Sequence, residues 1–209
     1  MLNALDALDR LRQGNARFAS GVVSVETLVT NARRADLVSG QRPFAVILGC
    51  SDSRVPVETI FDQGVGDLFV IRVAGNIVAP SQIGSVEFAA AQFGTRLVVV
   101  LGHTRCGAIE ATLAELQRPA ESSRHLLSIV DRIRPAVEGL IDTDLARDPE
   151  ALKRSAGRAN VRVAANALRH GSQILENLIE SDGLLVVGAE YALETGEVDF
   201  FDGVPADRS

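Results

Sequence analysis

The sequence predicts an α/β fold: a single domain with an open, mostly parallel sheet of strand order 2-1-3-4 and an antiparallel edge strand, flanked by helices. Three observations predict it. Four short apolar, β-branched runs are typical of strands buried on both faces. Helix-compatible segments separate these runs, and no repeat or Gly/Ser linker divides the chain. We expect one domain over residues 1–209, with an N-terminal helical arm at 1–40 and the α/β core at 41–209.

The four buried strands are expected in the runs FAVILGC, DLFVIRV, RLVVVLG and GLLVVGA, at residues 44–50, 67–73, 96–102 and 183–189. A fifth strand, EVDFF at 197–201, has an alternating pattern that places Val198 and Phe200 on one face. This pattern suits an edge strand that the chain enters through a turn at Thr195-Gly196.

Helices are expected between the strands, a short one near 56–62 and longer ones at 81–94 and 105–117. Asp148 is a predicted N-cap and Pro149 suits the first helical position. The helix that begins there is expected to run to about Ser181, with Gly157 and Gly171 as the points where it can be interrupted.

The N-terminal segment has leucines along one stripe of a predicted helix, with Phe18 further on and charged residues between: Leu2, Leu5, Leu8 and Leu11. One interpretation is a helix that covers its own domain. The other is an arm that packs on a partner subunit. The pattern itself does not decide between them.

Composition excludes several classes of protein. No apolar run approaches the roughly 20 residues needed to cross a bilayer, and the amino terminus lacks the basic-then-apolar order of a secretory signal. We therefore expect a cytoplasmic protein without membrane association. The net charge of −6 disfavours a nucleic-acid surface. Two cysteines in such a chain indicate a metal site, a catalytic thiolate or core packing rather than a disulfide framework.

Both cysteines, and one of the three histidines, follow predicted strands. Cys50 ends the first strand, while His103 and Cys106 follow the third in the sequence GHTRCGA. With strand order 2-1-3-4, the first and third strands are neighbours, and their carboxyl ends lie where ligands bind in open α/β sheets. A Cys2His set suits tetrahedral zinc, with the fourth position free for solvent as in catalytic zinc sites.

Core packing is the alternative for each of these residues taken alone, because free cysteines are often buried and a short His-x-x-Cys pair arises by chance. Their combination at adjacent strand exits favours zinc. Asp52 and Arg54 follow Cys50 in a tight turn. They are either a turn-stabilising ion pair or a catalytic pair in which Asp52 accepts a hydrogen bond from zinc-bound hydroxide and Arg54 keeps Asp52 ionised and oriented.

The sequences CSDSRVP at 50–56 and GHTRCGA at 102–108, with GDLFVIRVAGN between them, resemble those of β-class carbonic anhydrases, and the likeness extends from GNARF at 14–18 to the last strand. The resemblance implies zinc-dependent, reversible hydration of carbon dioxide to bicarbonate and a proton. It also implies Cys50, His103 and Cys106 as zinc ligands, Asp52 and Arg54 as the catalytic pair, and a homodimer or a dimer of dimers.

In such a reaction zinc-bound hydroxide attacks carbon dioxide, which is small, neutral and apolar and needs no charge steering. Two thiolate ligands neutralise the zinc charge, so the site is expected to work best above neutral pH. Backbone N–H groups near Gly107 are candidates to stabilise the developing anion. Histidine is the residue type that most often carries protons near neutral pH, but we assign neither His125 nor His170 as a proton shuttle.

Some members of this family are switched off by bicarbonate at a site built from a tryptophan, an arginine and a tyrosine. Arg72 and Tyr191 match two of these residues, but Ile47 stands at the tryptophan position. Regulation by bicarbonate is therefore not expected, and Arg72 and Tyr191 are interpreted as packing and ion-pair residues at strand ends. The motifs do not separate carbon dioxide from carbon disulfide or carbonyl sulfide as substrate. A non-catalytic, zinc-stabilised binding protein is the remaining alternative, which the Asp52–Arg54 pair disfavours.

Overall fold

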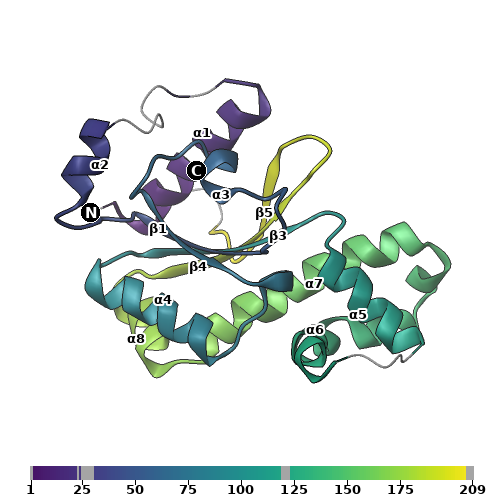
Figure 1. Cartoon of the computed structure of the whole chain (residues 1–209). Coiled ribbons are helices and arrows are strands. Elements are labelled where there is room, and N and C mark those ends of the chain that lie inside the picture. Colours follow the sequence, from purple (N-terminus) through teal and green to yellow (C-terminus); the bar gives the residue numbers. More distant parts are fainter. Residues whose placement is uncertain (1, 23, 25–30, 119–122, 206–209) are drawn as a thin grey trace.

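A computed structural model describes residues 2–22, 24, 31–118 and 123–205, with the side chains of 31–33 left aside. Five strands form one sheet in the order β2-β1-β3-β4-β5, seen nearly edge-on between two helical layers in Figure 1. The strands are β1 (Ala45–Gly49), β2 (Leu68–Arg72), β3 (Leu97–His103), β4 (Leu185–Tyr191) and β5 (Val198–Asp202). The first four are parallel and β5 is antiparallel to β4. The predicted fold class and strand order are confirmed.

The central strands are buried on both faces, as their continuous apolar sequences predict. Every residue of β1 and β3 is buried. β5 lies at the edge and contributes to both faces: Phe200 packs with the core on one side of the sheet and Phe201 with the core on the other. Gly196 has a φ of 78°, the left-handed conformation that the predicted turn before β5 requires.

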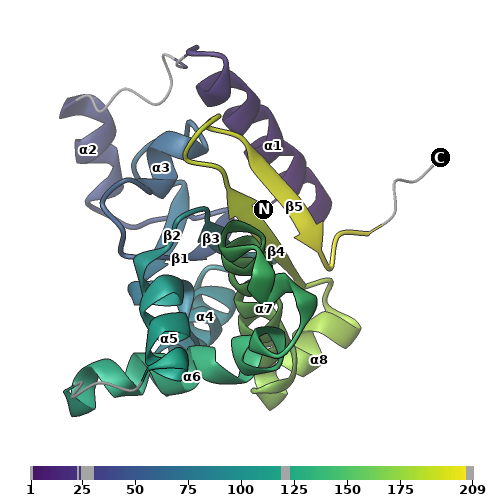
Figure 2. The ribbon, with the colours of Figure 1, turned by 90° about the vertical axis from the view of Figure 1, so that its right-hand side faces the viewer.

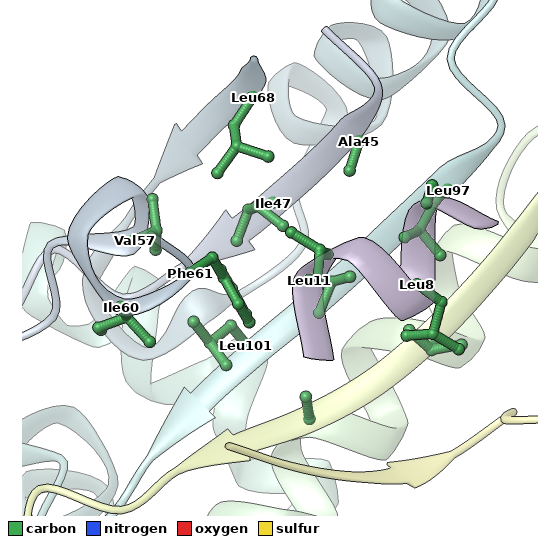
Figure 3. Close-up of a cluster of buried hydrophobic side chains, with 14 of the residues drawn as sticks. Leu8, Leu11, Ala45, Ile47, Val57, Ile60, Phe61, Leu68, Leu97 and Leu101 are labelled. Carbon is green, nitrogen blue, oxygen red and sulfur yellow. The ribbon is translucent and has the colours of Figure 1, made fainter. Parts of the chain in front are cut away.

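One face of the sheet is covered by helices from the first third of the chain, α1 (Ala4–Ala19) and α3 (Val57–Ile60), and α2 (Asn31–Leu37) lies on the same side. Leu8 and Leu11 of α1 are buried against β1 and β3 beside Phe61, as Figure 3 shows. Leu2 and Leu5 are instead more than a third exposed. The helix α1 therefore covers its own domain with the second half of the leucine stripe.

The other face carries α4 (Pro80–Gln92), α7 (Pro149–His170) and α8 (Gln173–Ser181). Asp148 caps α7 as predicted, because its carboxylate accepts hydrogen bonds from the backbone N–H groups of Glu150 and Ala151. The predicted interruption occurs at Gly171 alone. Gly157 stays inside α7 without breaking it.

A third cluster of buried side chains lies beyond the carboxyl ends of the strands. It is formed by α5 (Gly107–Gln117), α6 (Arg124–Ile141) and the first turns of α7. Figure 2 shows these three helices next to one another. The short helices η2 (Ala74–Asn76) and η3 (Asp144–Arg147) complete this region. Its core includes both cysteines. The sequence predicted no helix at α6. Within the described residues, no helix is both long and apolar enough to cross a membrane.

Candidate metal centre

Two neighbouring strands bring the three predicted ligands together. Cys50 follows β1 directly, His103 is the last residue of β3, and Cys106 is the N-cap of α5. Because β1 and β3 are adjacent and parallel, their carboxyl ends meet at one edge of the sheet. The two Sγ atoms and the nearest His103 ring nitrogen all lie within 4.8 Å of one another, and all three residues are buried. The predicted convergence is confirmed.

The sulfur geometry suits a shared ion and not a disulfide. The Sγ atoms of Cys50 and Cys106 are 4.0 Å apart, and both cysteines are free. A disulfide would hold these atoms at about 2.05 Å. Two thiolates that each lie about 2.3 Å from one tetrahedral zinc ion are separated by about 3.8 Å. The observed spacing is close to the second value.

The orientation of His103 suits a metal ligand. Nδ1 of His103 donates a hydrogen bond to the carbonyl oxygen of Thr104 at 2.8 Å, which fixes the proton on that nitrogen. Nε2 is buried and has no hydrogen-bond partner among the residues that the structure describes. A buried, unpartnered acceptor costs free energy unless something binds it. Its position beside two sulfurs fits a borderline-soft cation such as zinc.

The charges of the two thiols depend on each other. A hydrogen bond from the Cys106 thiol, together with one from the N–H of Gly75, outweighs burial and lowers the pKa of Cys50 below its usual value. The same bond, together with burial, raises the pKa of Cys106. The shared hydrogen bond thus favours the thiolate at Cys50 and the thiol at Cys106, and metal binding favours the thiolate form of both.

Asp52 faces this centre and is held by Arg54. Nε of Arg54 lies 2.9 Å from Oδ1 of Asp52, and Nη2 lies 2.7 Å from Oδ2. These hydrogen bonds hold the pKa of the Asp52 carboxyl well below its usual range. Oδ2 is also 3.9 Å from Nε2 of His103. The ionised carboxylate is thus directed toward the same point as the ligand atoms.

Arg72 has a role that the sequence did not reveal. Its Nε donates to the carbonyl oxygen of Cys50 at 3.1 Å, and its Nη2 donates to the carbonyl oxygen of Asp52 at 2.6 Å. Both bonds fix the backbone of the turn after β1. The strand order could have indicated this role. An arginine at the carboxyl end of β2 lies beside the end of β1, because Gly49 pairs with Arg72.

The other two positions compared with the bicarbonate site are apolar or aromatic and buried. Tyr191, at the end of β4, packs its ring 6.4 Å from that of Phe18. Ile47 lies at the centre of β1 and is fully buried. Of the two unassigned histidines, His125 is in the first turn of α6 and His170 ends α7. Neither lines the cavity beside the metal centre.

That cavity has a volume of about 210 Å³ and opens beside His103 and Cys106, with walls from α5, α7 and the end of β4. Glu190 of β4 lines it and is largely buried, with 14% of its side chain exposed. Burial raises the pKa of the Glu190 carboxyl above its usual value, although Arg158 lies 4.0 Å away and opposes the change. A strand run that ends in Gly-Ala-Glu gave no sequence signal for a buried acid.

Known proteins resemble this chain in sequence and in structure. The family model described as "Carbonic anhydrase" matches residues 45–198. Carbonic anhydrase 2 of Mycobacterium tuberculosis is 35% identical over 202 residues, which cover 97% of this chain and 95% of that protein. A carbonic anhydrase of Mycolicibacterium smegmatis is 37% identical over 197 residues, covering 94% and 93% of the two chains.

Among solved structures, a β-carbonic anhydrase of the filamentous ascomycete Sordaria macrospora superposes with a TM-score of 0.74 at 25% identity, covering 82% of this chain and 87% of that one. It is described as tetrameric. The family match spans most of the sheet and all three candidate ligands, and the relatives extend over nearly the whole chain. The chain therefore belongs to the carbonic anhydrase family, in its β class.

Proposed function

We propose that the chain catalyses the reversible hydration of carbon dioxide to bicarbonate and a proton, at a zinc ion held by Cys50, His103 and Cys106. One observation carries the proposal: the three buried donor atoms lie within 4.8 Å of one another, and the Asp52 carboxylate faces them, 3.9 Å from Nε2 of His103. A structural zinc site would be closed by a fourth fixed ligand. Among the described residues the candidate ligand group has three members, and Arg54 holds the Asp52 carboxylate beside them.

A bound zinc would supply the Lewis acid that lowers the pKa of water to the working range. The protein's own groups set the conditions. The thiolates of Cys50 and Cys106 would balance the charge of the cation. The Thr104 carbonyl keeps the proton of His103 on Nδ1, so the lone pair of Nε2 is available to bind the metal. The two thiolate charges favour operation above neutral pH.

Asp52 acts as a hydrogen-bond acceptor in this proposal. Its Oδ2 holds the proton of the reacting water in a shared hydrogen bond and so orients the remaining lone pair toward the substrate. Arg54 donates hydrogen bonds to both carboxylate oxygens, including Oδ2, and so keeps the group ionised. The N–H groups of the first turn of α5, which begins at Gly107, lie next to Cys106 and suit a developing negative charge.

The alternative substrates, carbon disulfide and carbonyl sulfide, have no support among the relatives described above, which carry the name carbonic anhydrase. The assembly is proposed to be a homodimer or a dimer of dimers. The tetrameric relative and the exposed Leu2 and Leu5 of α1 support it. We further propose a cytoplasmic location, from the sequence expectations alone.

Stopped-flow measurement of carbon dioxide hydration with zinc-loaded protein tests the function directly, with metal content and molar mass determined on the same sample. We expect one zinc per chain, rapid hydration and a mass of two or four chains. Cys106→Ser is expected to lose both zinc and activity. Hydration by the wild type at the uncatalysed rate, with zinc bound, would refute the proposal.

A further inference from the structure

A backbone N–H group contacts one of the candidate metal ligands. The N–H of Gly75 in η2 donates a hydrogen bond to Sγ of Cys50 at 3.3 Å, and both atoms are buried. Gly75 has a φ of 69° and a ψ of 18°, in the left-handed region that glycine adopts without strain. A Cβ there would lie 2.8 Å from Cδ1 of Ile133 and 3.1 Å from Cβ of Ala108. The position therefore requires glycine.

Glycine has more conformational freedom than any other residue, so its N–H is directed at the sulfur only if something outside η2 restrains it. Asn160 supplies such a restraint. Its Nδ2 donates a hydrogen bond to the carbonyl oxygen of Gly75 at 2.8 Å, from a position 85 residues further along the chain in α7. Asn160 is 2% exposed, so its amide is held by packing and water does not compete for the bond.

We propose that Asn160 is a positioning residue of the metal centre: it holds Gly75 so that the Gly75 N–H donates to the sulfur of Cys50, and thereby sets the metal affinity of the site and the electron density on that ligand. The inference depends on the proposed function for the presence of a metal. Hydrogen bonds to a ligating atom fix its orientation and draw charge from it, and their loss typically costs about 10–100-fold in metal affinity.

A second buried asparagine provides a matched control. Asn15 of α1 is 6% exposed, and its Nδ2 donates to the carbonyl oxygens of Ile60 and Gly196, at 3.2 and 2.9 Å. Neither acceptor belongs to a candidate ligand or to a residue bonded to one. Asn15→Leu and Asn160→Leu therefore remove the same chemical group, with similar volume, from two buried sites of which one adjoins the metal centre.

The probe is Co²⁺, whose thiolate-to-metal charge-transfer absorption reports the electron density on the sulfur ligands. For Asn160→Leu we expect this absorption to move to longer wavelength, and the metal dissociation constant, measured by competition with a chromophoric chelator, to rise about tenfold or more. Asn15→Leu is expected to retain the wild-type spectrum and a dissociation constant within about twofold, although its thermal stability falls because it loses buried hydrogen bonds of its own, including one that Asn15 accepts from the N–H of Val198.

Spectra and affinities that are the same in the two variants would overturn the proposal, because Asn160 would then be a structural residue only. If Asn160→Leu does not fold, Asn160→Ser is measured in its place. Wild-type protein loaded with ¹¹³Cd gives an independent test. A scalar coupling between the Gly75 amide proton and cadmium is expected, and its absence overturns the hydrogen bond itself.

These outcomes are separable from failure of the proposed function. Wild-type protein that binds neither Co²⁺ nor Zn²⁺ stoichiometrically would refute both. Wild-type protein that binds the metal but does not hydrate carbon dioxide would refute the proposed function and leave the role of Asn160 to be decided by the spectra.

Discussion

The carboxylate oxygen Oδ2 of Asp52 lies 3.9 Å from Nε2 of His103, the buried ring nitrogen that lacks a hydrogen-bond partner among the described residues. Arg54 binds that same oxygen at 2.7 Å. Stabilising the turn does not require the Asp52 carboxylate to face the candidate ligand atoms. The arrangement places an ionised acceptor at the open side of the candidate metal centre, and the predictions on Asp52 and Arg54 follow from it.

Asp52→Asn is expected to lower kcat/KM for carbon dioxide hydration about 100-fold or more, because the amide retains the size of the side chain but loses the charged acceptor. Zinc content should stay at the wild-type value, since Asp52 is not among the three buried ligands. Stopped-flow rates and elemental analysis measure the two quantities. Retention of full activity would remove Asp52 from the mechanism.

Arg54→Lys is expected to lower activity about 10-fold or more, because a lysine ammonium cannot form both of the hydrogen bonds that the guanidinium makes to Asp52. Arg54→Gln should lower it further, since the positive charge is also lost. The expected result is that kcat/KM decreases from the wild type to Arg54→Lys and decreases again in Arg54→Gln. Equal activity in the lysine variant would mean that charge alone, without the two-point contact, is sufficient.

Glu190→Gln tests the buried acid beside the centre. Burial raises the pKa of Glu190 in the folded protein above its unfolded value. At pH values between these two pKa values, the folded state therefore binds more protons than the unfolded state. The stability that this group contributes is complete below the unfolded pKa and is lost as pH rises through the folded pKa.

Denaturant unfolding across pH should therefore find Glu190→Gln more stable than the wild type at about pH 8, with the difference shrinking toward about pH 4. A difference that stays constant with pH would show that Glu190 has the same pKa in both states.

Zinc should stabilise the folded chain, because its ligands are assembled only in the folded state. With free zinc about 100-fold above its dissociation constant, the free energy of unfolding is expected to rise by about 2.7 kcal/mol over that of the chelated protein. Urea titrations with and without a chelator measure this. Cys106→Ser serves as the control and should respond much less. An equal zinc-dependent gain in stability in both proteins would show that zinc acts at a site that does not include Cys106.

Asp148→Ala removes the cap of α7 and is expected to lower the free energy of unfolding by about 1 kcal/mol. Specific activity and zinc content should not change, because the two amides that Asp148 accepts from belong to the first turn of α7 and not to a ligand. Chemical unfolding and stopped-flow assays of one preparation provide both values. Loss of zinc in this variant would indicate that the start of α7 supports the metal centre.

The parts predicted from sequence are those fixed by local pattern or by parallel sheet topology. Cys50 and His103 could be brought together because neighbouring parallel strands end at one edge, whatever the details of packing. β5 was predicted from the alternation of Val198 and Phe200, which the structure places in one core cluster.

Other features depended on information that a local pattern does not hold. The helix α6 was not predicted, although Ser123 caps it; Pro135 lies in its interior, a position that usually disfavours a helix. The bond between Asn160 and Gly75 joins two points far apart in the chain, and no spacing rule finds such a pair.

Cys50 and Cys106 are separated by 56 positions, and the sheet strands that carry them to one place come from different parts of the chain. Thiols so remote cannot chelate an ion in an open chain without closing a long, entropically costly loop. A molecule in which β1 and β3 fail to pair cannot bring these thiols together, so failed strand pairing is expected to abolish metal binding, and metal content read beside an independent measure of folding can reveal such molecules.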